Sequence, residues 1–218
     1  MTLTQAELAQ YQRDGFVLTR HVVTNWLPEM CASVDRMSDT AKAVTWRGPW
    51  MTPAAEPQLT AGHFNVETEQ PWTAITGAME GIAGQLLDAP PPLTVVQATI
   101  VSKPPRIGQP FPLHQDDAFY PQRDGRYVIG VIYLDDTTPE NGGIRFLPGS
   151  HRKGPIVHVQ DPNANKKHLP LDQYHIADTV EPEGKAGDVV WFHVWTVHGS
   201  YPNTSDHVRR TVRVGFRP

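Results

Sequence analysis

Residues 128–150 read VIGVIYLDDTTPENGGIRFLPGS, and this stretch decides the predicted fold class. It holds two apolar runs that are typical of short strands, residues 128–134 and 143–147. Turn-forming residues flank the second run, in Asn141-Gly142-Gly143 and in Pro148-Gly149-Ser150. Short strands with this punctuation favour an antiparallel β-sandwich or a jelly roll.

The same kind of pattern recurs on both sides of this stretch. Further strand-like segments cover residues 93–102, 188–193 and 210–216. Toward the N-terminus the pattern becomes helical, at residues 4–14, 26–43 and 71–88. Thr4 and Glu7 have the spacing of a capping box at the start of the first helix. Residues 44–70 and 158–182 show no regular period, so we expect irregular structure there.

The length and composition of the chain agree with this predicted fold class. A chain of 218 residues fits one large domain, and its 21 prolines and 17 glycines indicate a turn-rich fold rather than a helical bundle. We therefore expect a single domain over residues 1–218, mainly β with flanking helices. In it, a helical part, residues 1–92, packs on a jelly-roll core, residues 93–218.

Charge and cysteine content exclude several classes of protein. The net charge of −4 gives no basic surface for nucleic acid. Cys31 is the single cysteine, so a disulfide framework within the chain is impossible. The sequence shows neither a signal-peptide pattern at its start nor an apolar run of membrane-spanning length. We expect a cytoplasmic protein without nucleic-acid or membrane partners.

The segment most informative about chemistry is Pro112-Leu113-His114-Gln115-Asp116-Asp117. If the chain is extended there, His114 and Asp116 project to the same side, because side chains two apart share a face of a strand. A second histidine, His198, follows a strand-like segment near the C-terminus. Two histidines and one carboxylate on one face of a metal leave positions open, as in iron(II) oxygenases.

Other interpretations of these residues stay open at this point. An isolated His-x-Asp is common, and ten histidines make a later His-Gly-Ser unsurprising. Zinc prefers a closed tetrahedral site or a helical His-Glu-x-x-His motif, and the sequence has no such motif.

The order of the surrounding motifs makes the chain similar to the phytanoyl-CoA dioxygenase family, and to the ectoine hydroxylases of the same superfamily. The resemblance runs over most of the length. It rests on LTQAELAQYQRDGFVL (3–18), SKPP (102–105), PLHQDDAFY (112–120), DDTTPENGGIRFLPGSHRKG (135–154) and KAGDVVWFHVWTVHGSYPNTSDHVRRTVRVGF (185–216).

This resemblance implies a double-stranded β-helix, which is a cupin-like jelly roll, with Fe(II), 2-oxoglutarate and O₂ as reactants. It assigns His114, Asp116 and His198 to the metal. Arg209 matches the arginine that pairs with the far carboxylate of 2-oxoglutarate, a role that suits a planar, permanently charged guanidinium. Arg210 is the rival, and on an extended strand it faces the other way.

Further residues are candidates for cosubstrate binding. Lys103 matches a lysine that assists cosubstrate binding in relatives, or it is a solvated lysine at a strand end. Gln97 and Thr99 alternate with Lys103, so all three share one face of a regular strand, which would look into the barrel. Ser200 either contacts the cosubstrate or shapes a turn.

The resemblance implies a dioxygenase that hydroxylates an unactivated C–H bond of a small molecule and releases succinate and CO₂. Desaturation, epimerisation or oxidative cyclisation would use the same cofactors. Rivals of other classes are a non-catalytic jelly-roll protein that binds a small ligand and a cupin-type zinc or manganese hydrolase. We expect a monomer or a homodimer.

Overall fold

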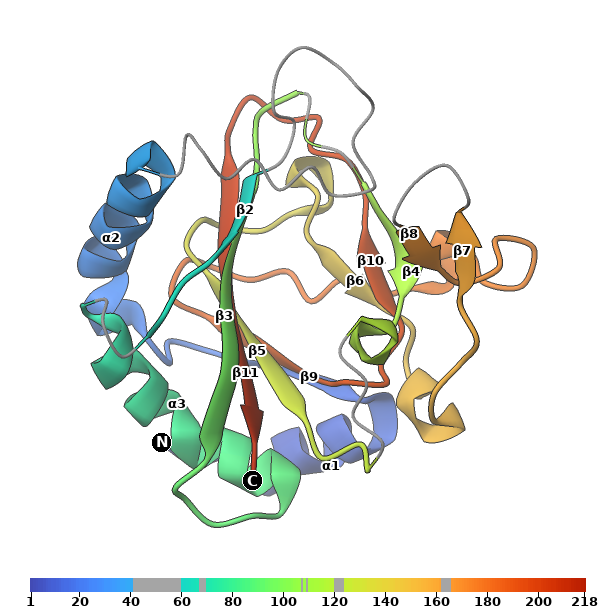
Figure 1. Cartoon of the computed structure of the whole chain (residues 1–218), viewed down its shortest axis with the longest axis horizontal. Coiled ribbons are helices and arrows are strands. Elements are labelled where there is room, and N and C mark those ends of the chain that lie inside the picture. Colours follow the sequence, from blue (N-terminus) through green and yellow to red (C-terminus); the bar gives the residue numbers. More distant parts are fainter. Residues whose placement is uncertain (41–59, 67–69, 107, 109, 120–123, 162–165) are drawn as a thin grey trace.

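Two antiparallel sheets face each other in the computed structural model, and three helices lie against the outer side of the larger sheet (Figure 1). The structure describes residues 1–40, 60–66, 70–106, 108, 110–119, 124–161 and 166–218. The helices are α1 (Gln5–Asp14), α2 (Leu27–Thr40) and α3 (Trp72–Leu87). Short 3₁₀ turns join several strands, and η3 (Asp116–Ala118) matters for the site.

Eleven strands are described, and nine of them form the two facing sheets. The larger sheet has the order β1-β9-β5-β11-β3-β2 and the smaller has the order β4-β10-β6. Their bounds are β1 (Phe16–Thr19), β2 (Thr60–His63), β3 (Thr94–Lys103), β4 (Phe111–His114), β5 (Val128–Tyr133), β6 (Ile144–Phe146), β9 (Val189–His193), β10 (His198–Ser200) and β11 (Arg209–Arg217). β7 (Val159–Asp161) and β8 (Lys166–His168) form a separate hairpin. The predicted jelly roll with flanking helices is confirmed.

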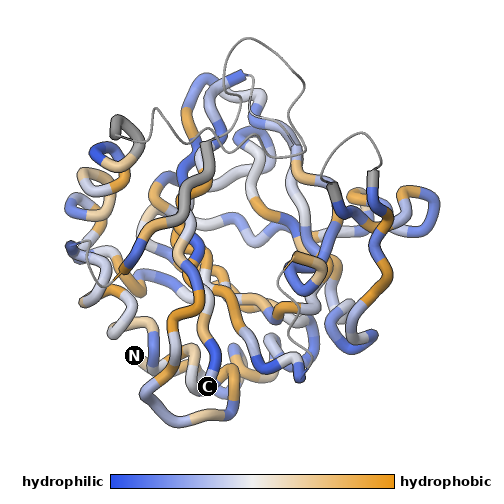
Figure 2. Tube along the Cα trace, in the orientation of Figure 1, coloured by the Kyte–Doolittle hydropathy of each residue, from blue (hydrophilic) through white to orange (hydrophobic). Residues whose placement is uncertain are grey.

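Strand alternation gives the larger sheet two different faces. In β5, Val128 and Ile132 belong to the core under the helices, whereas Ile129 and Val131 belong to the core between the sheets. The fully buried strand therefore has no polar alternation, since both of its faces are covered. Figure 2 shows hydrophobic residues gathered along these central strands and on the helices beside them.

β11 alternates in the same way, but the residues on its inner face are polar. Val212, Val214 and Phe216 pack under the helices. The alternate residues Arg209 and Arg213 line a cavity between the sheets. Polar side chains inside an otherwise apolar strand therefore mark the wall of a site.

Helix α1 is linked to the loop that leads to β10. The predicted capping box at Thr4 is present: the Glu7 N–H donates to Thr4 Oγ1 over 3.2 Å, and the Thr4 N–H donates to the Glu7 carboxylate over 2.7 Å. Gly15 ends the helix with φ of 84°, a backbone conformation that favours glycine. Its carbonyl accepts from the Thr196 hydroxyl over 2.8 Å, two residues before His198. The helix end thus fixes the turn that precedes β10.

Some boundaries differ from the prediction. β2 lies within residues 44–70 and the β7–β8 hairpin lies within residues 158–182, both of which we expected to be irregular. β1 and β2 join the larger sheet, so residues 1–92 contribute strands as well as the predicted helices; a short strand beginning at Phe16 was expected, and β2 was not. Residues 41–43 of the predicted second helix lie outside the described residues.

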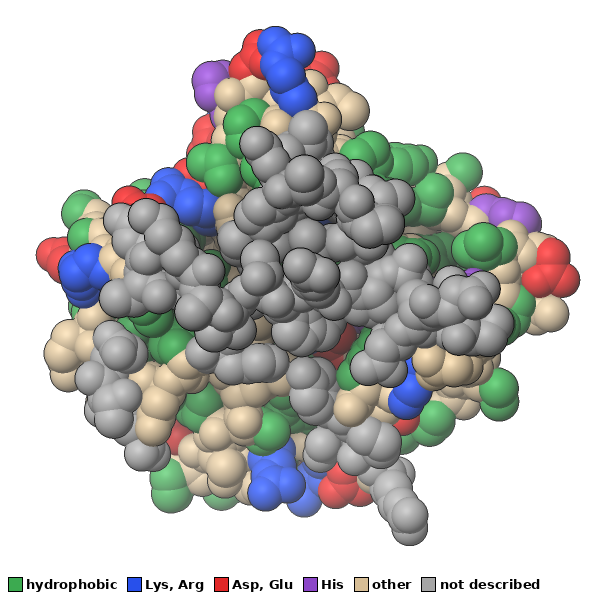
Figure 3. Space-filling model, turned by 45° about the horizontal axis from the view of Figure 1, so that its top comes forward, with side chains coloured by type: hydrophobic (Ala, Val, Ile, Leu, Met, Phe, Trp, Pro, Cys, Tyr) green, Lys and Arg blue, Asp and Glu red, His purple; other side chains and the backbone are tan. Residues whose placement is uncertain are grey.

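Two observations bear on membrane and nucleic-acid binding. In the described part of the chain, no helix has the length and apolar character needed to cross a bilayer. On the face shown in Figure 3, the described basic and acidic side chains are scattered around the rim and form no broad basic patch.

Candidate metal centre

The segment from His114 to Asp116 is extended, as predicted. Gln115 has φ of −110° and ψ of 142°, so the side chains of His114 and Asp116 project to the same side. The Gln115 side chain points away and holds the segment in place. Its Nε2 donates to the carbonyls of Trp195 over 2.6 Å and Gly154 over 3.0 Å, and its Oε1 accepts from the Ile156 N–H over 2.7 Å.

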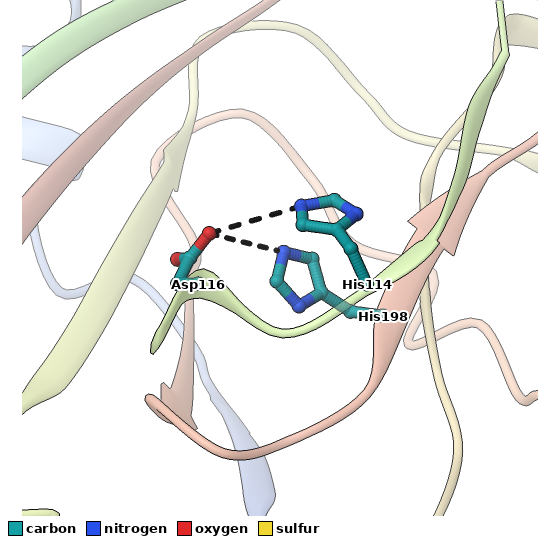
Figure 4. A group of neighbouring side chains, drawn as sticks. All are labelled: His114, Asp116 and His198. Atoms are coloured by element: carbon teal, nitrogen blue, oxygen red, sulfur yellow. Dashed lines mark ion pairs between the residues drawn. The ribbon is translucent and has the colours of Figure 1, made fainter. Parts of the chain in front are cut away.

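His198 reaches the same point from the neighbouring strand. β4 and β10 are antiparallel with His114 directly opposite His198, which puts both imidazoles on one face of the smaller sheet. Oδ1 of Asp116 lies 3.8 Å from Nε2 of His114 and 3.7 Å from Nε2 of His198 (Figure 4). All three residues are buried, and their ligand atoms lie within 4.8 Å of one another.

Backbone carbonyls fix the tautomers of both histidines. Nδ1 of His114 lies 2.8 Å from the Pro112 carbonyl, and Nδ1 of His198 lies 3.0 Å from the Thr196 carbonyl. A carbonyl only accepts, so Nδ1 carries the proton and the Nε2 lone pair faces Asp116. Burial lowers the pKa of His114 to about 3 and also lowers the pKa of His198. Both imidazoles are therefore neutral at physiological pH.

Asp116 is ionised in this setting. Burial acts to raise the pKa of its carboxyl group, but the positive charge of Arg213, which pairs with it, outweighs burial, and the pKa lies below the usual value. The centre thus has one carboxylate oxygen and two imidazole lone pairs that converge with no proton between them. Such a set of acceptors fits a divalent cation, whose charge removes their mutual repulsion.

A cavity of about 70 Å³ adjoins this cluster and is lined from both sheets. Arg209 lies in its wall and is 4% exposed. Its guanidinium donates to the Gly142 carbonyl over 3.0 Å and to the Thr211 hydroxyl over 3.1 Å, while its Nε has no partner. No ion pair to Arg209 is formed by the residues that the structure describes. A buried cation without a carboxylate fits an anionic ligand that enters the cavity.

Lys103 and Ser200 lie beside Arg209. Lys103 stands opposite Arg209 in the register of β3 and β11, and its Nζ donates to Ser200 Oγ over 2.6 Å and to the Tyr201 carbonyl. Lys103 is fully buried, contrary to the interpretation as a solvated lysine. Burial, followed by the charge of Arg209, lowers the pKa of Lys103 to about 6. Ser200 lines the cavity.

Thr99 and Gln97 lie farther along β3. Thr99 is buried and pairs with Arg213 in the β3–β11 register, and Gln97 pairs with Gly215. Neither lines the cavity, whereas Val101, on the same strand face, does. Gln97 Nε2 is buried without a hydrogen-bond partner. The face predicted for this strand therefore points inward, but its contribution to the cavity comes from Val101.

Two polar residues of the cavity wall were not predicted from the sequence. Thr211 lines the cavity and accepts from Arg209, and Arg213 forms an ion pair with Asp116. Both follow Arg209 at two-residue intervals, so strand alternation was the signal that would have found them. Arg210 faces outward as expected and pairs with Asp135 over 2.8 Å.

His193 lies apart from the metal cluster. Its Nδ1 accepts from the Trp195 N–H over 3.1 Å, and its ring packs against His151 with centroids 5.6 Å apart. Burial, followed by the charge of His151, lowers the pKa of His193 from 6.5 to about 4.

This shift predicts a pH-dependent contribution to stability. Below pH 6.5 the unfolded chain protonates His193 but the folded chain does not, so the contribution is lost as pH falls from about 6.5 toward 4. The slope is at most about 1.4 kcal/mol per pH unit. His193→Asn keeps an acceptor for Trp195 and does not titrate, so urea unfolding of this variant should show a shallower pH dependence than the wild type. The exposed His175→Asn is the control, and equal slopes for wild type and His193→Asn would contradict the assignment.

A jelly roll with two histidines and one carboxylate converging beside an inner cavity has the architecture of the facial-triad oxygenases. The sequence signature described as phytanoyl-CoA dioxygenase (PhyH) matches residues 11–211. The chain therefore belongs to the phytanoyl-CoA dioxygenase family.

The curated relatives match only part of the chain. The chain is 34% identical over 120 residues to a probable alpha-ketoglutarate-dependent hypophosphite dioxygenase of Stutzerimonas stutzeri, covering 52% of this chain and 41% of that protein. It is 32% identical over 160 residues to an L-proline trans-4-hydroxylase of Streptomyces griseoviridis, covering 64% and 59%. The chain thus spans about half the length of these curated relatives. The carbocyclase SnoK from nogalamycin biosynthesis shares the fold, with a TM-score of 0.77, 24% identity and coverage of 99% of this chain and 84% of that one.

Proposed function

We propose that this protein is an Fe(II)- and 2-oxoglutarate-dependent dioxygenase that hydroxylates a C–H bond of a small molecule. His114, Asp116 and His198 would hold the iron. The observation that carries the proposal is the convergence of three unprotonated ligand atoms beside a buried arginine without an anionic partner. A metal centre alone would not need a buried arginine without an anionic partner.

Arg209 would bind the far carboxylate of 2-oxoglutarate. Its unpartnered Nε and its permanent charge suit a two-pronged contact with a carboxylate. Lys103 would add a second donor, because an arriving anion favours its protonated form. Ser200 would keep Lys103 in place. Thr99 and Gln97 remain weaker candidates, since neither lines the cavity.

The protein supplies binding and orientation, and the bound group supplies the oxidation. When bound, iron provides the chemistry by which 2-oxoglutarate and O₂ yield succinate and CO₂ while the substrate is hydroxylated. Phe119, Phe192 and Phe146 surround the imidazoles, with ring centroids 5.6 Å from His114 and 4.6 Å and 6.0 Å from His198. These apolar rings pack against the imidazoles, where they would exclude water and hold the imidazoles in place.

The relatives support a small-molecule substrate. The curated relatives named above are described by their action on hypophosphite and L-proline, and the solved SnoK is described as a carbocyclase. We therefore propose a free small molecule as the substrate, with cyclisation, epimerisation or desaturation as alternative outcomes of the same residues. The unpartnered charge of Arg209 argues against a zinc or manganese hydrolase, which needs no 2-oxo acid.

The test is succinate formation by purified protein. We expect slow succinate release that requires both Fe(II) and 2-oxoglutarate, and faster release when the correct small molecule is added from a metabolite panel. Manganese or zinc in place of iron should give no succinate. Absence of succinate under every condition, with the protein folded and loaded with iron, would contradict the proposal and favour a ligand-binding protein.

A further inference from the structure

Arg213 is a residue of the cavity wall that contacts one of the three proposed metal ligands. It stands on the inner face of β11, two positions beyond Thr211, opposite Thr99 on β3 and Val131 on β5. Its side chain reaches Oδ2 of Asp116 and forms an ion pair there. Asp116 is almost fully buried at 2% exposure, so this partner decides how the carboxylate is oriented.

The two oxygens of Asp116 have different surroundings. Oδ1 faces both histidines, at 3.8 Å and 3.7 Å from their Nε2 atoms. Oδ2 is occupied by Arg213. A carboxylate with both oxygens free can bind a metal through one or two of them, and the second oxygen then takes a coordination position. Here only Oδ1 is left to face an ion.

We propose that Arg213 is a positioning residue that holds Oδ2 of Asp116 and so keeps this carboxylate a one-oxygen ligand. The inference rests on the proposed function. Its consequence concerns the open face of the centre, since 2-oxoglutarate needs two adjacent positions and O₂ needs another. Arg213 preserves these positions by keeping Oδ2 away from the metal.

The proposal predicts opposite effects on the two ligands. In Arg213→Met the second oxygen is released and a nearby positive charge is removed, so Fe(II) binds as tightly as in the wild type or more tightly. Loss of the partner of a metal ligand typically costs about tenfold or more in metal affinity or activity. Here we expect the loss in the dissociation constant of 2-oxoglutarate, which rises by at least about tenfold because Oδ2 takes a position that the 2-oxo acid needs. An ion pair that only stabilised the barrel would weaken the binding of both ligands together.

The experiment is an anaerobic titration of each variant with Fe(II) and then with 2-oxoglutarate, following the visible absorption of the ferrous 2-oxo acid complex. Arg213→Lys should recover part of the 2-oxoglutarate affinity, because the ammonium still pairs with Asp116. Arg217→Met, at the exposed end of the same strand, is the matched control and should behave as the wild type. Thermal unfolding verifies that each variant is folded, and Arg213→Leu replaces Arg213→Met if the latter is not.

The outcomes are distinct. Unchanged 2-oxoglutarate affinity in Arg213→Met or Arg213→Leu, or a parallel loss of both ligands, would overturn the assignment of Arg213. If the wild-type protein itself binds iron but gives no 2-oxoglutarate complex, the proposed function fails instead.

Discussion

Replacing Asp116 with asparagine should weaken Fe(II) binding by at least about 100-fold and abolish succinate formation. The substitution removes the only carboxylate of the cluster while keeping its volume, and the amide oxygen can still accept a hydrogen bond from Arg213. Alanine would leave the partly buried Arg213 without its carboxylate partner and would endanger folding. Anaerobic titration with Fe(II) measures the first effect and succinate analysis measures the second.

The neighbouring Asp117→Asn serves as the control, because Asp117 is not among the converging ligands. We expect this variant to bind iron and form succinate at wild-type levels. Wild-type iron affinity in a folded Asp116→Asn variant would show that the ligand assignment is wrong.

Arg209→Met should mainly affect the cosubstrate. Truncating one partner of a buried charged pair costs about 2–5 kcal/mol, so the dissociation constant of 2-oxoglutarate should rise by roughly 30-fold to 5,000-fold. Iron binding should remain, since the hydrogen bonds of Arg209 go to Thr211 and Gly142 and Arg209 is not one of the three ligands. In steady-state succinate assays, the KM for 2-oxoglutarate should rise far more than kcat falls.

Arg210→Met separates this effect from a general loss of stability. Arg210 forms ion pairs with Asp135 and Asp35 on the outer side of the sheet, at 2.8 Å and 2.9 Å. Its replacement should lower the thermal unfolding temperature and leave the KM for 2-oxoglutarate unchanged. The reverse pattern, with Arg210 rather than Arg209 controlling the KM, would mean that the two faces of β11 are assigned wrongly.

Strand alternation explains why much of the centre was predictable from the sequence. The two-residue spacing of His114 and Asp116 has one outcome in an extended chain, and the structure has that extended conformation at Gln115. The same rule separated Arg209 from Arg210. It also applied to Arg213, but the sequence alone could not show that Asp116 would lie opposite it, because that contact joins residues of different elements.

Other features had no local signal. β2 has the sequence Thr60-Ala61-Gly62-His63, in which Thr60 is the single β-branched residue and Ala61 and Gly62 are types depleted in strands. It forms by pairing with β3. β4 contains Pro112 and lies at the edge of the smaller sheet, where a missing N–H is tolerated. Tertiary pairing created both strands, so local propensity did not reveal them.

The most direct test of the metal centre is X-ray absorption spectroscopy of the wild-type protein loaded anaerobically with one equivalent of Fe(II). We expect one tightly bound iron per chain with scattering from two imidazoles, reduced to one imidazole in His198→Asn. An iron spectrum without imidazole scattering, or one that His198→Asn leaves unchanged, would contradict this ligand assignment.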